Sequence, residues 1–279
     1  MRAKLSSVAN AVALLKAFSD ERYEMGITAL AQRLGLAKST VHRLAATLVG
    51  AGMLEQNAET EKYRLGLAAF ELGALVRRKM DVSTAAKAYL MALREETGET
   101  VHLAVADASE IVYINYLESQ NAVRISSAIG LRKPIHCTAE GKAALADRIC
   151  DERDCLKALR LERRTPQTIT DLEVLARELA IVRAQGFAID DEESEIGMRC
   201  IAAPIHDEAG HVAAAIGIAG PIQRLPKRRL LSFGPALRKA TEEISLRLGG
   251  GSAPSNAGGR AGSRSESPIA RRSSAAGRE

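Results

Sequence analysis

Residues 25–66 read MGITALAQRLGLAKSTVHRLAATLVGAGMLEQNAETEKYRLG. Apolar residues recur at three- and four-residue spacing on both sides of Gly35, which is the pattern of two amphipathic helices. Glycine accepts the left-handed conformation that ends one helix and lets the chain turn into the next. The stretch therefore predicts a short helix over 28–34 and a second helix that starts near Lys38 and ends at Gly50 and Gly52.

The second helix is expected to carry polar side chains on its outer side and first turn. Two short strands should follow, over 54–56 and 63–65, joined by a polar turn. This order is that of a winged helix-turn-helix, in which such side chains bond phosphates and base edges. The candidate DNA-contacting residues are Thr28, Lys38, Ser39, Thr40, His42, Arg43, Thr47 and, on the returning strand, Arg64.

Three small amphipathic helices of an interaction domain are the alternative interpretation of this stretch. The Lys38-Ser39-Thr40 run argues against it, because it puts a cation and two hydroxyls in the turn that enters the major groove. Ala37 argues for it, because a Ser or Asp cap is expected there and its absence costs about 1 kcal/mol.

Length and composition indicate an ordinary soluble protein. The chain has 279 residues, with 46% hydrophobic and 26% charged residues, which suits two domains. No stretch approaches the length of a membrane span, and the N-terminus lacks the basic-then-apolar pattern of a signal peptide. We therefore expect a cytoplasmic protein that does not bind membranes, and we interpret residues 8–18 as a helix of the winged domain.

The cysteines and histidines do not indicate a metal site. The four cysteines, at positions 137, 150, 155 and 200, lack the paired spacing of zinc ribbons, and the five histidines lack a ligand motif. Buried thiols are the expected role of the cysteines. We predict neither a metal nor a cofactor.

Charge is divided unevenly along the chain. Residues 1–66 carry 9 basic and 6 acidic side chains, residues 67–248 carry 25 and 26, and residues 249–279 carry 5 and 2. A basic small domain attached to a near-neutral larger one fits contact with double-stranded DNA through the N-terminal part.

The sequence predicts four parts: a winged helix-turn-helix over 5–66, a linker helix over 67–81, an effector-binding domain over 82–248 and a disordered tail over 249–279. The linker is rich in apolar residues, at Leu67, Phe70, Ala74 and Leu75, and part of it should meet a second copy of the chain. Its basic run, 77–79, is expected to be a solvated helix end.

The larger domain should mix helices and strands. Helices are expected over 84–96, 138–148, 171–185 and 228–248, and strands over 100–106, 111–117, 123–128, 187–189, 201–206 and 212–218. An antiparallel sheet flanked by helices, an α+β fold, follows from that order.

At this point the chain resembles the IclR family of bacterial transcriptional regulators over residues 5–248. The signature of that family is matched by Gly186, Asp190, Glu193, Cys200, Ile201, Ala202, Ile205, His206 and Asp207. Residues 134–143 and 36–44 are similar to its other characteristic blocks. The resemblance implies a linker helix that pairs two chains, a GAF-like C-terminal domain that binds a small effector, and assembly into dimers or tetramers.

The resemblance also implies an effector pocket. Relatives that bind small carboxylates use two serines on the last strand, and this chain has Gly217 and Ala219 instead. The implied pocket residues are Ala139, Glu140, Asp190, Cys200, Gly217 and Ala219. Two lost hydroxyls free volume and remove donors, and Glu140 would repel an anion. The expected partner is a small organic effector, an organic acid or an aromatic or amide-like catabolite, and we expect it to be larger or less anionic than pyruvate or glyoxylate.

The expected function is a ligand-responsive regulator that binds the operator of a catabolic or metabolic operon. The alternative is a small-molecule-binding enzyme domain fused to a DNA-binding module, suggested by the acidic run 190–195 and the His136-Cys137 pair. Neighbouring strand residues point to opposite faces, and acidic runs are usually solvated loops, so we expect no enzyme activity. An architectural DNA-binding protein is disfavoured by the size of the second domain.

Overall fold

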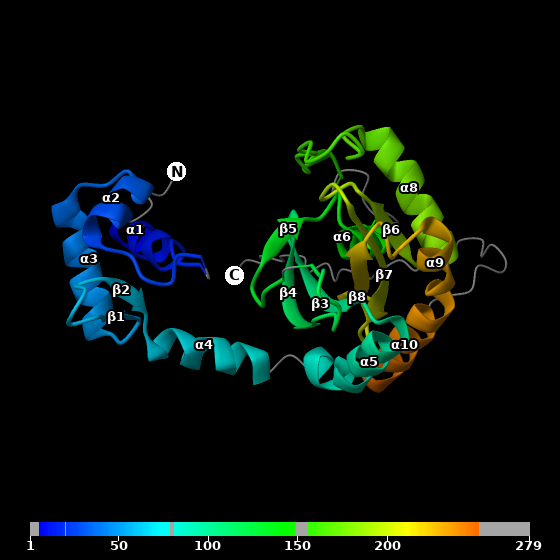
Figure 1. Cartoon of the computed structure of the whole chain (residues 1–279), viewed down its shortest axis with the longest axis horizontal. Helices are drawn as coiled ribbons and strands as arrows, with labels where there is room; N and C mark the ends of the chain where they lie inside the picture. The colour runs from blue at the N-terminus through cyan, green and yellow to red at the C-terminus, as the bar shows by residue number, and fades with distance from the viewer. Residues whose placement is uncertain (1–5, 20, 79–80, 126, 149–155, 251–279) are drawn as a thin grey trace, which may run out of the picture.

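The computed structural model describes residues 6–19, 21–78, 81–125, 127–148 and 156–250. Figure 1 shows a small N-terminal domain and a larger C-terminal domain, connected through the helix α4. The predicted tail beyond residue 250 and the thiols of Cys150 and Cys155 lie outside the described residues.

The N-terminal domain has the predicted winged helix-turn-helix order. Its elements are α1 (Ser6–Leu15), α2 (Ile27–Leu34), α3 (Lys38–Gly50), β1 (Leu54–Gln56) and β2 (Tyr63–Leu65). Gly35 has a φ of 64°, so the left-handed turn between α2 and α3 is present as the sequence predicts. The buried side chains of Leu14, Leu30, Val41, Leu54 and Tyr63 come from all five elements and form one core.

The linker helix α4 spans Leu67–Arg78 and presents apolar side chains to solvent. Phe70 is 70% exposed, and Leu67, Leu72, Leu75 and Val76 are more than half exposed. Isolated apolar residues on a surface are ordinary, whereas exposed apolar residues that recur along one helix make that helix a candidate interaction surface. The exposure of this helix is thus as the sequence indicates.

The C-terminal domain is built on one antiparallel sheet of six strands, in the order β5-β4-β3-β8-β7-β6. The strands are β3 (Thr100–Asp107), β4 (Glu110–Leu117), β5 (Arg132–Pro134), β6 (Ala188–Asp191), β7 (Met198–His206) and β8 (Val212–Pro221). The flanking helices are α5 (Asp81–Thr97), α6 (Ala139–Arg148), α8 (Leu172–Gln185), α9 (Lys227–Ser232) and α10 (Gly234–Arg247). The α+β fold class predicted from the sequence is confirmed.

The helices divide between the two faces of the sheet (Figure 1). α5, α9 and α10 pack on one face, against the large aliphatic side chains of Val101, Leu103, Ile201, Ile216 and Ile218. α6 and α8 pack on the other face, where the strands present mostly alanine: Ala104, Ala188, Ala202, Ala215 and Ala219. Small side chains let α6 approach the sheet closely.

Two predictions about the C-terminal domain were wrong. Residues 123–128 do not form a strand in their described part; the backbone carbonyl of Val123 instead accepts a hydrogen bond from Arg224, and Ile125 alone is buried. The helix expected over 228–248 is two helices, because Pro235 lies at the start of α10 and has no N–H to continue α9. The short strand β5 was not predicted.

Within the described residues, no helix has both the length and the apolar composition that crossing a bilayer requires.

Candidate functional site

The outer side of α3 carries the predicted DNA-contacting side chains. Lys38, Ser39, His42, Arg43 and Thr47 are exposed, and Thr40 is half-buried. Ala37 makes no side-chain cap, as its identity indicates, and its carbonyl accepts hydrogen bonds from the amides of Thr40 and Val41. Thr28 is exposed in the first turn of α2. The outer side of α3 therefore presents exposed polar and basic side chains to solvent.

Two of these candidates already have partners. The Arg64 guanidinium lies 3.0 Å from the Glu55 carboxylate on β1 and 3.7 Å from that of Glu24. The hydroxyl of Thr47 donates to the Arg43 carbonyl at 3.0 Å, within α3. Arg64 therefore has to exchange these ion pairs for a phosphate before it can contact DNA.

The predicted effector residues gather on the alanine-rich face of the sheet. Strand register aligns Thr100, Ala219, Cys200 and Asp190 in one row across β3, β8, β7 and β6. The next row contains His102, Gly217, Ala202 and Ala188. Because every second residue of a strand faces the same side, both rows point toward α6.

A cavity of about 20 Å³, here called the inner cavity, lies between these rows and the start of α6. Its lining comprises His102, Tyr113, Ile125, Lys133, Thr138, Glu140, Asp190, Ser194, Met198, Arg199, Cys200 and Ala219. This volume is about that of one water molecule. Four of the six predicted effector residues line it; Ala139 and Gly217 do not.

Gly217 nevertheless shapes the inner cavity through Glu140. A Cβ atom built on Gly217 would lie 2.1 Å from the Glu140 Oε1 atom and 3.1 Å from the Cys200 Sγ atom. The sequence comparison predicted that replacing a serine by Gly217 would free volume. The structure corrects that expectation, because the Glu140 carboxylate fills the space.

His102 and Tyr113 are site residues that the sequence did not reveal. Their rings stack with centroids 4.5 Å apart, and the Nδ1 atom of His102 lies 3.6 Å from the Oε1 atom of Glu140. Neither ring nitrogen of His102 has a hydrogen-bond partner among the described residues, although the side chain is buried. His102 stands inside an otherwise apolar strand run, at 101–105, and that position is the signal from which it could have been found.

Glu140 is fully buried at the start of α6. Burial alone would raise the pKa of its carboxyl, but the neighbouring His102 and the backbone N–H at the start of α6 outweigh burial and lower the pKa below its ordinary value. The thiol of Cys200 lies 3.7 Å from Glu140 Oε1, and burial raises its pKa well above the usual range. The inner cavity therefore places an acidic side chain beside a buried thiol.

Asp190 organises the turn between β6 and β7. Its carboxylate accepts hydrogen bonds from the amides of Glu193 and Ser194, at 2.7 and 3.2 Å, and from the Ser194 hydroxyl at 2.5 Å. Burial raises the pKa of Asp190 to about 6, although these hydrogen bonds oppose the rise.

Glu193, the next acidic residue of the motif, forms an ion pair with the fully buried Lys142 of α6, with 2.5 Å between Oε1 and Nζ. Lys142 also lies 3.3 Å from Glu178 of α8. Burial raises the pKa of Glu193 to about 7. The motif thus ties the β6–β7 turn to both helices on this face.

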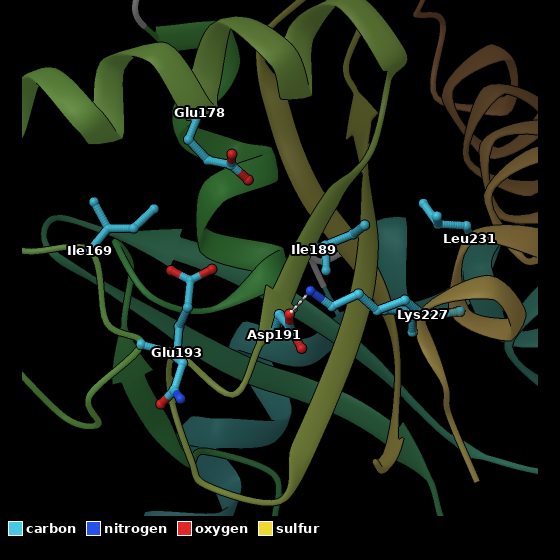
Figure 2. Close-up of a pocket in the computed structure, with 9 residues that line it drawn as sticks. Ile169, Glu178, Ile189, Asp191, Glu193, Lys227 and Leu231 are labelled. Carbon is cyan, nitrogen blue, oxygen red and sulfur yellow. Dashed lines mark ion pairs between the residues drawn. The ribbon is translucent and has the colours of Figure 1, made fainter. Parts of the chain in front are cut away.

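A larger cavity, of about 440 Å³ and here called the outer cavity, lies along the edge strand β6 and is lined from both α8 and α9 (Figure 2). Ile189 and Asp191 line it, while Asp190 between them lines the inner cavity, as alternation along a strand requires. Glu178 and Glu193 extend toward one another at its margin, and Asp191 forms an ion pair with Lys227 at 2.6 Å. Most of its charged groups are therefore engaged in ion pairs with other parts of the domain.

The His136-Cys137 pair does not have the geometry of a catalytic pair. The two residues lie in the turn before α6 rather than on a strand. The sequence-based expectation that they point to opposite faces of a strand was therefore wrong. The His136 ring hydrogen-bonds the Glu162 carbonyl at 3.0 Å, whereas the Cys137 thiol is directed at the Pro134 carbonyl. Burial raises the pKa of Cys137 to about 12, which is the opposite of what a nucleophilic thiol needs.

The acidic run 190–195 does not converge on one point: Asp190 and Ser194 line the inner cavity, Asp191 and Glu193 line the outer cavity, and Glu192 and Glu195 line neither. No group of three or more histidine, cysteine, aspartate or glutamate side chains suited to a metal ion occurs in the part of the chain that the structure describes.

The comparison with protein families matches both domains. Residues 7–58 match the IclR helix-turn-helix domain, and residues 74–246 match the family described as bacterial transcriptional regulator IclR C-terminal. The chain belongs to the IclR family. This IclR protein is accordingly a DNA-binding transcriptional regulator with a ligand-binding C-terminal domain.

Relatives and solved structures of the IclR family agree. The HTH-type transcriptional regulator KdgR of Escherichia coli is 40% identical over 246 residues, which cover 88% of this chain and 93% of KdgR. A putative IclR regulator from Silicibacter sp. TM1040 superposes with a TM-score of 0.74 at 32% identity, over 89% of this chain and 98% of that one.

An IclR homologue from Microbacterium hydrocarbonoxydans has a TM-score of 0.74 at 27% identity, over 87% of this chain and 98% of that one, and its crystal structure contains 4-hydroxybenzoate.

Proposed function

We propose that this IclR-family regulator binds its operator as a dimer or tetramer and releases or tightens it when a small organic effector enters the inner cavity. One observation supports this proposal most. The chain combines a helix α3 with exposed polar side chains and a C-terminal sheet with a buried cavity lined by polar side chains on one face. A catabolic or metabolic operon is the expected target, and an enzymatic role is not expected, since the relatives are regulators.

The proposed dimer contact is α4. Its apolar row is exposed in the single chain, and burying apolar surface stabilises association by roughly 25 cal/mol per Å². A two-fold dimer presents two α3 helices to a pseudo-palindromic site, with half-sites about one helical turn apart. Coupling between effector and operator of about 1–3 kcal/mol then changes operator affinity by 5- to 150-fold.

Arg43 carries the clearest test of DNA contact. The Arg43→Ala variant should bind operator DNA about 5- to 150-fold more weakly, because a good arginine–base contact contributes roughly 1–3 kcal/mol. Arg177→Ala is the matched control, because it removes the same charge from the exposed surface of α8. An electrophoretic shift of operator DNA at two salt concentrations measures both, and equal affinities for the two variants would refute the assignment.

Asp190 carries the corresponding test of the sensor domain. Asp190→Ala should abolish the effector's influence on the operator shift while leaving DNA binding without effector intact. The effector is found by screening organic acids, aromatic catabolites and amides for relief or enhancement of the wild-type shift. Loss of effector response in Arg43→Ala together with loss of DNA binding in Asp190→Ala would contradict the division between the two domains.

A further inference from the structure

We propose that Glu140, lodged against Gly217, determines the specificity of the inner cavity: it excludes small carboxylate effectors and selects a ligand that turns an N–H donor, an amide or ammonium group, toward the Glu140 carboxylate. The inference rests on the proposed function of the cavity as the effector site. It assigns a chemical class to the ligand and a role to two residues that act as a pair.

The first argument is steric. The Glu140 side chain reaches its position only because residue 217 has no side chain, since any Cβ there would overlap its Oε1 atom. About 20 Å³ remains beside it, so a ligand has to interact with Glu140 or displace it. Because an acidic group is already in place, a second acidic group would meet like charge where little solvent is present to screen it.

The second argument concerns which acceptors still lack donors. Asp190 accepts three hydrogen bonds from the β6–β7 turn. Glu140, in contrast, has the backbone N–H at the start of α6, while its Oε1 atom has only the Cys200 thiol at 3.7 Å and His102 Nδ1 at 3.6 Å, both longer than an ordinary hydrogen bond. A buried carboxylate gains most from an added donor when its present partners are poor.

The third argument concerns the cations that line the inner cavity. Lys133 lies 3.4 Å from the Glu195 carboxylate, and Arg199 lies 2.6 Å from that of Asp191. An incoming carboxylate therefore has to compete with an existing anion for either side chain. The two ring nitrogens of His102, which lack hydrogen-bond partners, offer one donor and one acceptor when the ring is neutral and so favour neither class of ligand. The long contacts of Glu140 Oε1 and the cations already paired both favour a donor-bearing ligand.

Two isosteric pairs of probes test the proposal: pyruvate with pyruvamide, and 4-hydroxybenzoate with 4-hydroxybenzamide. Each pair differs only in whether a carboxylate or an amide is offered. Isothermal titration of the full-length protein should show each amide binding at least about tenfold more tightly than its carboxylate. In Glu140→Gln that preference should disappear or reverse, because the amide side chain donates as well as accepts. Glu96→Gln, which removes an exposed charge from α5, should keep the wild-type preference.

A double-variant cycle tests the steric pairing independently of any ligand. Gly217→Ala should lower the melting temperature, because Glu140 is forced from its position, and adding Glu140→Ala should restore most of the loss. The effects of these two substitutions on the melting temperature should therefore not be additive. Equal losses from Gly217→Ala in the presence and absence of Glu140 would overturn the proposed contact.

The outcomes separate the inference from the proposed function. A wild-type preference for the carboxylates, or an unchanged preference in Glu140→Gln, overturns the inference and leaves the cavity as the effector site. Failure of all four probes on both proteins also overturns it. The wider operator-shift screen then decides on the proposed function alone.

Discussion

The two faces of the six-stranded sheet are built from different residues although they share every strand. The face under α5 and α10 presents isoleucine, leucine and valine, whereas the face under α6 and α8 presents alanine and glycine with His102 and Asp190 among them, and Glu140 reaches it from α6. The first face is a hydrophobic core that stabilises the domain. The second contains buried polar groups, which are costly unless they are paired, beside the inner cavity.

The largest expected effect comes from breaking the ion pairs of Lys142 on the α6 face. Lys142→Ala leaves the buried carboxylate of Glu193 and the half-buried carboxylate of Glu178 without their cation and should lower the free energy of unfolding by about 3–5 kcal/mol. Urea denaturation measures the loss. The double variant Lys142→Met/Glu193→Gln should recover much of it, and Lys87→Ala on the exposed side of α5 should change stability by less than about 0.5 kcal/mol. A loss in Lys142→Ala no greater than in Lys87→Ala would contradict this account.

The pH dependence of stability should reveal the polar face next. Burial raises the pKa of Asp190 to about 6, from an ordinary value of 3.8, so between pH 4 and pH 6 the folded state keeps a proton that the unfolded chain has released. The free energy of unfolding should therefore fall as the pH rises through this window, by roughly 3 kcal/mol for a shift of about two units. Glu193 acts in the same direction.

Denaturation at pH 4.5 and pH 7 tests this sign. Asp190→Asn should remove the share of Asp190 from the difference, whereas Asp81→Asn, an exposed change at the start of α5, should not. A wild-type profile that Asp190→Asn leaves unaltered would mean that Asp190 carries no such penalty.

The sequence predicted those elements whose signals are local and missed those that depend on contacts between distant segments. The recognition helix, the wing and α6 were predicted to within a residue or two, because a period of 3.6 or 2 and a glycine at the turn are local signals. The strand predicted over 123–128 was wrong. In the described part of this segment only Ile125 is buried, and the Val123 carbonyl accepts a hydrogen bond from Arg224. Which carbonyl meets a distant guanidinium is not encoded in a local pattern.

The site residues show the same limit. Glu140, Asp190 and Cys200 were found through a motif, but His102 was missed, because its partner Gly217 faces it across two strands that are more than a hundred residues apart in sequence. The prediction that Gly217 frees volume in the cavity was also wrong. The sequence shows that a side chain is missing at 217, and only the packing shows that Glu140 fills the gap.

A moderate effect is expected from enlarging a residue on the α6 face. Ala215→Val adds two methyl groups beneath α6, where alanine permits close packing, and should cost about 1–3 kcal/mol. Because that face also borders the inner cavity, effector response in the operator shift should weaken as well. Thermal denaturation and the operator shift measure the two effects, and a neutral result in both would show that the small residues are not needed for packing.

The smallest expected effect comes from the next residue of the same strand, which faces the other side. Ile216→Val removes one methyl group from the aliphatic core and should cost about 0.5–1.5 kcal/mol, with effector response unchanged. Ala215→Val and Ile216→Val therefore compare the two faces of the sheet at adjacent positions of β8. An altered effector response in Ile216→Val would weaken the separation of roles between the two faces.

The contact between Glu140 and Gly217 also constrains the order in which this pocket can evolve. A lineage that regains a serine at 217 before shortening residue 140 passes through an intermediate in which the Glu140 carboxylate has to rotate out of its position. Shortening residue 140 first opens a void but causes no overlap. A change of inducer chemistry along such a lineage is then a two-step path whose two orders differ in cost, and the order that begins at residue 140 avoids the overlap.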